Sequence, residues 1–320
     1  MKVLFHENQL SYRGTSVSLF DYAYYNEKLL GNQSVIVYNR TNPNTNSSAL
    51  QRFKQHFKVV SYDDISELDT IIKVIEPDVL YAIKSGENDL INTNLCKMCV
   101  HTVFKVYEPH GDVYAYVSEW LANHMHKGSQ FVPHMINIPD SEESLHEELN
   151  IPKNAKIFGY YGGKDSFDIK FVQRTVKKLA LIDHSCYFIF MGVDDFTIPK
   201  YFWQQKREYK NIKFLPANPD PLYKVRFINT CTAMLHARMR GETFGIAIGE
   251  FAIKNVPIIT YSESAEKAHI DILGECAYYY HNKKSLLEII NSSLKISAKI
   301  KYDEFSPEKV MSKFEQVFLK

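Results

Sequence analysis

Short apolar runs alternate along the chain with longer amphipathic stretches. In the first part of the chain, the runs that predict strands are residues 3–5, 35–37, 59–60, 79–83 and 102–107. Helices are expected between them, for example over residues 16–30, ended by Gly31, and over residues 68–75, ended before Pro77. Strands that alternate with helices predict βαβ units and a parallel sheet.

The pattern pauses over residues 132–148 and then restarts. This stretch contains Pro133, Pro139 and the acidic run 140–143, a composition typical of a linker. Strands are expected after it at residues 157–161, 187–191, 212–215, 232–236, 256–261 and 276–280. The helix between the first two places these apolar residues on one face: Val172, Val176, Leu179 and Ile182. We therefore predict two α/β halves facing each other across a cleft at the carboxyl ends of their strands, where open parallel sheets bind ligands.

The last helix is expected to begin with Ser306 as its cap and Pro307 at its first position. Its apolar stripe consists of Val310, Phe314, Val317 and Phe318. This stripe has to pack on another surface, and a return to the first half is one option. The predicted organisation is a first domain over residues 1–135, a linker over 136–150, a second domain over 151–305 and a C-terminal helix over 306–320.

Composition narrows the class of protein. The chain has 320 residues, 45% of them hydrophobic, enough for one large or two moderate cores. Its 38 basic and 37 acidic residues leave a net charge of +1, which gives no global attraction to nucleic acid or to an anionic membrane. The N-terminus reaches His6 and Glu7 after a short apolar run, so no signal peptide or integral membrane segment is expected. We expect a cytoplasmic protein.

Neither cysteines nor acidic pairs indicate a metal site. The five cysteines are scattered, and the Cys96–Cys99 pair has no second pair or histidine pair to complete a zinc site, so packing on a helix is the preferred interpretation. The adjacent pairs at residues 63–64 and 194–195 are interpreted as turn or cap aspartates. No metal and no cofactor are therefore expected.

Residues 232–260 carry the strongest chemical signal, because they read as strand, loop, helix and strand. The helix is expected to start near Gly245 and to end at Asn255. A helix N-terminus offers free N–H groups and a positive dipole end, which suit a diphosphate. Glu242 precedes the helix and can accept hydrogen bonds from sugar hydroxyls. Glu250 lies about one and a half turns inside it and can accept from ribose hydroxyls.

Glu242 and Glu250 form a Glu-x7-Glu pattern with Phe244-Gly245 inside it, which resembles the retaining glycosyltransferases usually called family 4. The resemblance covers nearly the whole chain. It implies an α/β GT-B fold, with two facing Rossmann-like domains and a central cleft. It also implies transfer of a sugar from a UDP- or GDP-sugar to a glycan or other hydroxyl acceptor, with retention and without a metal. Glu242 would contact the transferred sugar, Thr243, Phe244 and Gly245 would bind the donor, and Glu250 would bind the ribose.

Two segments of the first half fit the same resemblance. Gly14 and Thr15 follow the first strand, where the family has a glycine-rich loop near the donor phosphates and the acceptor. His110 follows the strand expected at residues 102–107. The resemblance implies that this histidine lies beside the reacting carbon, as a catalytic residue, with His124 and His134 as lesser candidates. Residues 84–89 and 112–116 are candidate acceptor loops.

The family places an arginine just after the first strand of the second half and a lysine six residues later, and both bind the diphosphate. This chain departs from that pattern, because the arginine position holds Tyr160 or Gly163. Lys164 and Lys170 are six residues apart, and Arg238 or Arg240 are alternative sources of positive charge. Gly163, Lys164, Lys170 and Arg238 thus join Gly14, Thr15, Thr243, Phe244, Gly245 and Glu250 as predicted donor-binding residues.

Three other classes of protein are alternatives to this interpretation. A non-catalytic nucleotide-sugar or glycan-binding protein on the same fold is the main alternative, because the basic clamp is altered. A nicotinamide-dependent oxidoreductase is disfavoured, since no Gly-x-Gly-x-x-Gly follows the first strand. A GT-B epimerase or phosphorylase differs only in its product. The sequence sets neither the sugar, nor the acceptor, nor the oligomeric state.

Overall fold

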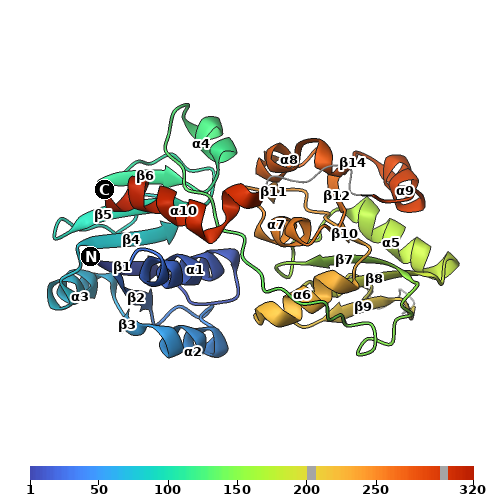
Figure 1. Ribbon diagram of the computed structural model, residues 1–320, viewed down its shortest axis with the longest axis horizontal. Helices are drawn as coiled ribbons and strands as arrows, with labels where there is room; N and C mark the ends of the chain where they lie inside the picture. The colour runs from blue at the N-terminus through green and yellow to red at the C-terminus, as the bar shows by residue number, and fades with distance from the viewer. Residues whose placement is uncertain (200–206, 296–301) are drawn as a thin grey trace. The chain divides into compact units, whose positions relative to one another are not determined.

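The computed structural model describes residues 1–199, 207–295 and 302–320 (Figure 1). The chain divides into two compact units. Unit 1 comprises Met1–Ile136 and Asp303–Lys320, and unit 2 comprises Asn137–Tyr302. The C-terminal segment therefore belongs to the same unit as the N-terminus, and residues 137–150 belong to unit 2.

Unit 1 is built on a six-stranded parallel sheet with the strand order β3-β2-β1-β4-β5-β6. Its strands are β1 (Lys2–Glu7), β2 (Gln33–Asn39), β3 (Lys58–Tyr62), β4 (Val79–Lys84), β5 (Lys97–Thr102) and β6 (Val113–Tyr116). Its helices are α1 (Gly14–Lys28), α2 (Ser47–His56), α3 (Leu68–Ile75), α4 (Glu119–Met125) and α10 (Pro307–Phe314).

Both faces of this sheet are covered by helices. Successive side chains of a strand point to opposite faces, so neighbouring residues show what covers each face. Leu4 and Leu80 point to the face covered by α3, where Ile72 is buried. Phe5 and Tyr81 point to the other face, where both rings contact Phe314 of α10. Helix α10 is therefore part of the core of unit 1. Its first turn has the expected cap, because Ser306 Oγ accepts from the Lys309 N–H at 3.5 Å.

One strand prediction is wrong. The strand expected at residues 102–107 is displaced, because β5 covers Lys97–Thr102 and the chain turns after it. Phe104 and Tyr107, which suggested a strand, are 39% and 47% exposed. The interpretation of the Cys96–Cys99 pair as packing on a helix is wrong for the same reason. Cys96 immediately precedes β5, and Cys99 is buried within it.

Unit 2 has a second six-stranded parallel sheet, of order β14-β12-β10-β7-β8-β9. Its strands are β7 (Lys156–Tyr161), β8 (Cys186–Met191), β9 (Ile212–Leu215), β10 (Ala233–Leu235), β12 (Ile258–Tyr261) and β14 (Tyr278–Tyr280). Its helices are α5 (Lys170–Ile182), α6 (Pro221–Thr230), α7 (Ile246–Ile253), α8 (Ala268–Leu273) and α9 (Lys283–Asn291). A short parallel pair, β11 (Gly241–Glu242) and β13 (Glu266–Lys267), lies outside this sheet.

The apolar face predicted for α5 is correct for three of its four residues. Val172, Val176 and Leu179 are buried, whereas Ile182 is 66% exposed at the last position of the helix. The helix ends there, and this final side chain lies in solvent.

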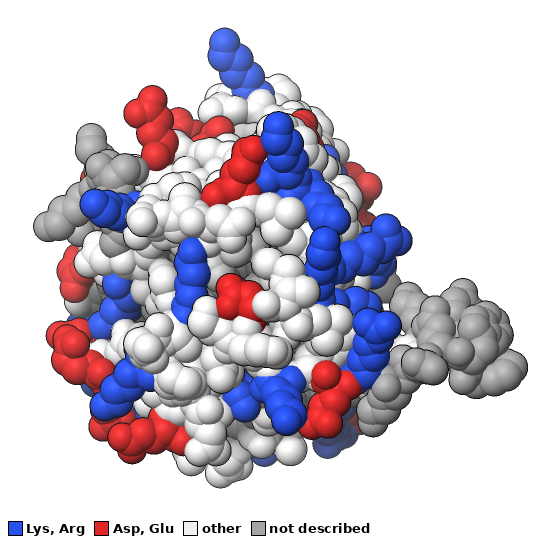
Figure 2. Space-filling view, turned by 90° about the vertical axis from the view of Figure 1, so that its right-hand side faces the viewer, with Lys and Arg blue, Asp and Glu red and all other residues white. Residues whose placement is uncertain are grey.

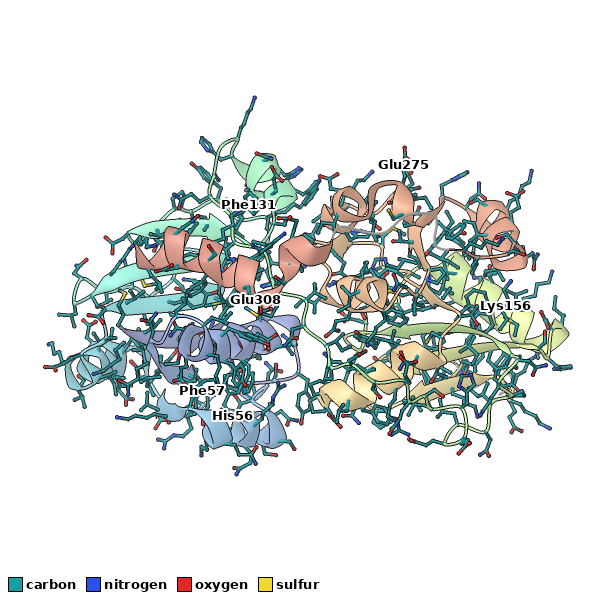
Figure 3. The ribbon with its side chains drawn as sticks, in the orientation of Figure 1. His56, Phe57, Phe131, Lys156, Glu275 and Glu308 are labelled. Atoms are coloured by element: carbon teal, nitrogen blue, oxygen red, sulfur yellow. The ribbon has the colours of Figure 1, made fainter. Side chains whose placement is uncertain are left out.

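The two sheets share one strand order, in which the first strand of each unit lies beside the fourth. The order reverses between β1 and β4 in unit 1 and between β7 and β10 in unit 2. Open parallel sheets bind ligands at the carboxyl ends of their strands, where the order reverses. Figure 3 labels Lys156 at the amino end of β7, where its ammonium donates to the Ser292 carbonyl at 3.2 Å. The candidate site of unit 2 is therefore expected at the opposite end of this strand.

Charged residues are mixed on the part of the surface seen in Figure 2. Lys and Arg side chains lie there among Asp and Glu side chains, and neither sign covers the whole face. This distribution agrees with the near-zero net charge.

Candidate functional site

The segment with the Glu-x7-Glu pattern folds as predicted, into a strand, a loop and a helix. Gly245 caps α7 with φ +100°, in the left-handed region that favours glycine. A Cβ at this position would lie 3.3 Å from His269 Cβ and 3.4 Å from Glu242 Cβ. The first N–H groups of α7 have no carbonyl partner within the helix. This helix therefore offers N–H groups and a positive dipole end at its N-terminus, as the sequence predicts.

Glu242 is held by two basic side chains. Arg238 Nη1 lies 2.8 Å from Glu242 Oε2, and His236 Nε2 lies 3.4 Å from Glu242 Oε1. Burial raises the pKa of Glu242, but the hydrogen bond from His236 and the charge of Arg238 outweigh it and lower this pKa to about 2. The side chain is 20% exposed. Glu242 is thus an ionised, oriented acceptor that a ligand can reach.

The loop before Glu242 is anchored to the residues that follow β7. Asp168 accepts a hydrogen bond from the Met239 N–H at 2.7 Å, and its own N–H donates to the Ala237 carbonyl at 3.0 Å. The Tyr160 ring packs against His236 with centroids 5.8 Å apart. The ends of β7 and β10, where the strand order reverses, are therefore joined through this loop.

Glu250 occupies a different environment, inside α7. Its side chain is buried, Tyr161 Oη donates to its Oε2, and Lys224 Nζ of α6 lies 3.2 Å from its Oε1. Tyr160 and Tyr161 are neighbours in β7, so their side chains point to opposite faces. Tyr160 faces the Glu242 side and Tyr161 the Glu250 side. The two glutamates consequently flank the carboxyl end of β7.

The predicted basic residues do not form one cluster. Lys164 is exposed after β7 and makes no ion pair within residues 1–199, 207–295 and 302–320. Lys170 begins α5 and lies 3.4 Å from Gln173 Oε1. Arg240 pairs with Glu266 at 3.0 Å. Gly163 is exposed, and a Cβ there would meet no atom within 4 Å. Of the predicted cations, Arg238 contacts a glutamate of the motif.

The remaining predicted residues lie in unit 1, near the ends of β1 and β4. Gly14 is the first residue of α1, and Thr15 Oγ1 donates to Glu7 Oε1 at 2.5 Å. His110 Nε2 lies 3.2 Å from Lys84 Nζ, and its Nδ1 lies 2.7 Å from the Glu108 carbonyl. Lys84 also pairs with Asp89. His110 therefore belongs to a polar cluster with a lysine from one of the predicted acceptor loops.

The two lesser histidine candidates lie apart from this cluster. His124 stacks on Trp120 within α4, with ring centroids 4.8 Å apart. His134 is buried beside Tyr22, and burial lowers its pKa well below the usual range. These contacts are those of packing residues.

Three side chains that contact Glu242 or Glu250 were not predicted from the sequence. His236 could have been noticed, because it ends a predicted strand six residues before Glu242. Tyr161 and Lys224 carry no local signal, since their roles arise from the packing of β7 and α6 against α7.

Two features are absent from the residues that the structure describes. In residues 1–199, 207–295 and 302–320, no group of three or more His, Cys, Asp or Glu side chains is arranged to hold a metal ion. The described helices include none that is long and apolar enough to cross a membrane.

Comparison with known proteins identifies the fold. No protein-family model matches the chain, and no curated protein matches it. HepE from Anabaena, solved with UDP and glucose, superposes with a TM-score of 0.67 at 13% identity, over 99% of this chain and 95% of HepE. A TarM variant from S. aureus, solved with Fondaparinux, α-GlcNAc-glycerol and UDP, superposes with a TM-score of 0.69 at 10% identity, over 100% of both chains.

A third similar structure is that of a protein from Listeria monocytogenes described as a UDP-N-acetylglucosamine 2-epimerase, which is a different activity. It superposes with a TM-score of 0.61 at 10% identity, over 99% of this chain and 96% of its own. Similarity at these identities defines the fold. The α/β GT-B class predicted from the sequence is confirmed, with two parallel sheets of six strands each.

Proposed function

We propose that this protein is a glycosyltransferase that moves a sugar from a UDP-sugar to a glycan or other hydroxyl acceptor. The observation that carries the proposal is the ionised Glu242, held by Arg238 and His236 beside the N-terminus of α7. This arrangement lies where the strand order of unit 2 reverses. The presence of UDP in the HepE and TarM structures supports the choice of base.

Each part of the arrangement has a chemical role in the proposed reaction. Glu242 accepts hydrogen bonds from hydroxyls of the transferred sugar. Departure of UDP develops negative charge on its β-phosphate, which the N–H groups of Thr243, Phe244 and Gly245, the α7 dipole and the Arg238 guanidinium stabilise. Glu250, held by Tyr161 and Lys224, accepts from the ribose hydroxyls. Because these groups carry the charge, the proposed transfer needs no metal, and we propose that it proceeds with retention.

The proposal retains the other predicted residues with the roles that the family resemblance implies. Gly163, Lys164 and Lys170 would bind the diphosphate. In unit 1, Gly14 and Thr15 would lie near the phosphates and the acceptor. His110 would contact the transferred sugar, and the cytoplasm is the proposed compartment.

The first test replaces each glutamate of the motif. We expect Glu242→Ala and Glu250→Ala each to lower UDP-sugar affinity or turnover at least tenfold, about 1.4 kcal/mol, because each removes an acceptor for donor hydroxyls. Donor binding is first established by thermal shift with UDP and GDP, since a ligand that binds the folded state raises apparent stability. Turnover is then followed as UDP release from UDP-glucose, with and without EDTA, and NMR of the product shows its anomeric configuration.

The matched control is Glu288→Ala, which removes an exposed carboxylate from α9 in the same unit. It should leave affinity and turnover unchanged. Wild-type values in both Glu242→Ala and Glu250→Ala, with the donor bound in the same place, would overturn the assignment.

A non-catalytic UDP-sugar-binding protein is the second candidate. It is favoured by two observations: the charge of Arg238 is paired with Glu242, and Tyr160 or Gly163 stands where the family pattern has an arginine. Tight UDP-sugar binding without any product would decide for it. An epimerase on this fold would be recognised by a changed sugar in the product.

A further inference from the structure

His236 joins two neighbouring strands of unit 2 to Glu242. It follows β10 directly, and its N–H donates to the Ile259 carbonyl of β12 at 2.8 Å. Its Nδ1 lies 2.8 Å from Thr260 Oγ1, and its Nε2 lies 3.4 Å from Glu242 Oε1. The side chains of His236 and Thr260 are both buried. The imidazole therefore connects the rigid sheet to a partly exposed carboxylate.

The hydrogen bond to Glu242 has a defined direction. An ionised carboxylate can only accept, so Nε2 of His236 has to carry the hydrogen that points to Glu242. The other ring nitrogen, Nδ1, is held by the hydrogen bond with Thr260 Oγ1. These hydrogen bonds connect Thr260 through His236 to Glu242. The ring is also packed edge-on against His269, with centroids 5.0 Å apart, which limits its rotation.

These hydrogen bonds determine which acceptor sites of Glu242 remain for a ligand. His236 and Arg238 each occupy one of its two oxygens, on the protein side. A carboxylate accepts about four hydrogen bonds, so about one site on each oxygen remains. Two acceptor sites, one on each oxygen of the carboxylate, suit a pair of neighbouring sugar hydroxyls.

We propose that His236 is a positioning residue, which orients Glu242 for the hydroxyls of the donor sugar and thereby lets the site distinguish a UDP-sugar from UDP. This inference rests on the proposed function. It adds a determinant of sugar recognition that makes no contact with the sugar itself.

The test uses two substitutions that separate the two nitrogens of His236. The amide of Asn can occupy the place of Nδ1, so His236→Asn keeps the Thr260 contact and loses Glu242. The amide nitrogen of Gln can reach the place of Nε2, so His236→Gln retains a donor to Glu242. Titration calorimetry on the full chain measures Kd for UDP and for UDP-glucose, UDP-galactose and UDP-N-acetylglucosamine, and the tightest UDP-sugar is used for the comparison.

We expect His236→Asn to raise Kd for the UDP-sugar about tenfold while Kd for UDP changes less than twofold. The Gln variant should return the UDP-sugar affinity to within about threefold of the wild type. Thr260→Val, nearly isosteric, removes the hydroxyl that holds Nδ1 of His236 and should weaken the UDP-sugar about threefold without affecting UDP. This variant keeps the inference testable if His236→Asn does not fold.

His101→Asn is the matched control, because His101 is also a buried imidazole with two hydrogen-bond partners, and it lies in unit 1. It should lower stability and leave the ratio of the two affinities unchanged. Equal losses for UDP and UDP-sugar in His236→Asn would reveal a merely structural role and overturn the inference. So would a wild-type protein that binds UDP and all three UDP-sugars equally. Absence of any UDP binding would instead refute the proposed function itself.

Discussion

Glu7 gives a prediction about stability that can be worked through from its surroundings. This carboxyl ends β1, is 4% exposed, and accepts a hydrogen bond from Thr15 on one oxygen. Its Oε2 is buried without a hydrogen-bond partner among the described residues. Burial raises the pKa of Glu7 from 4.5 to about 8, although Thr15 and Ser16 act in the opposite direction. The folded protein therefore holds this proton through neutral pH.

The sign of the pH dependence follows from this shift. Below pH 4.5 the carboxyl is protonated in both states, and its stabilising contribution is fully present. Between pH 4.5 and about 8 the unfolded chain has released the proton and the folded chain keeps it, so the free energy of unfolding falls by about 1.4 kcal/mol per pH unit. The loss from pH 5 to pH 8 amounts to at most about 4 kcal/mol.

Glu7→Gln removes the titration and keeps the shape and the acceptor for Thr15. The assay is urea unfolding of both proteins at pH 5, 6, 7 and 8, and the quantity of interest is the difference in their free energies of unfolding. This difference should shift in favour of the variant by up to about 4 kcal/mol across the series. Titrations shared by both proteins cancel in it.

The control is Glu308→Gln, because this side chain is exposed on α10 of the same unit and is labelled in Figure 3. Its series gives the baseline for loss of an exposed carboxyl from the same unit. A difference for Glu7→Gln that changes by less than about 0.5 kcal/mol between pH 5 and pH 8 would refute the reasoning.

Two further substitutions test the packing of each unit. Gly241→Ala should destabilise unit 2 by about 2 kcal/mol or more, because φ is +79° and the new Cβ would lie 2.0 Å from the Glu266 carbonyl oxygen. Thermal unfolding measures this loss. The control Gly163→Ala, with open space around the new Cβ, should change the melting temperature little. Phe314→Ala should cost unit 1 about 3–5 kcal/mol, because this ring is fully buried. Urea unfolding checks that value, and a loss no larger than that of Val74→Ala, at a 76% exposed position, would contradict the role assigned to α10.

Much of the fold could be predicted because both sheets are buried on two faces. Such strands appear as short apolar runs, and β9 coincides with the predicted residues 212–215. The strand predicted at residues 102–107 was wrong, because Phe104 and Tyr107 have strand propensity but lie in an exposed loop. Strand order could not be predicted, because periodicity describes one element and not its neighbour. The apolar stripe of α10 was visible in the sequence, whereas its partners Phe5 and Tyr81 were not.

In the candidate site, too, the residues close together in sequence could be predicted and their distant partners could not. Glu242 and Gly245 were predicted because they are close in sequence and sit at the start of a helix. The contacts that hold Glu242 and Glu250 come partly from distant residues, Thr260 through His236 and Lys224 from α6. Residue spacing carries no information on such contacts, so these supporting side chains can be identified only in the folded structure.

The membership of α10 in unit 1 has a consequence for synthesis on the ribosome. Unit 2 is continuous from Asn137 to Tyr302, so all its strands have been translated before α10. Unit 1 begins at Met1 but needs Phe314 to cover the face of the sheet that bears Phe5 and Tyr81. Domains fold as units when their residues become available. Unit 1 therefore completes its fold after unit 2, although most of its residues are translated earlier, and a chain that stops before α10 leaves this aromatic face open.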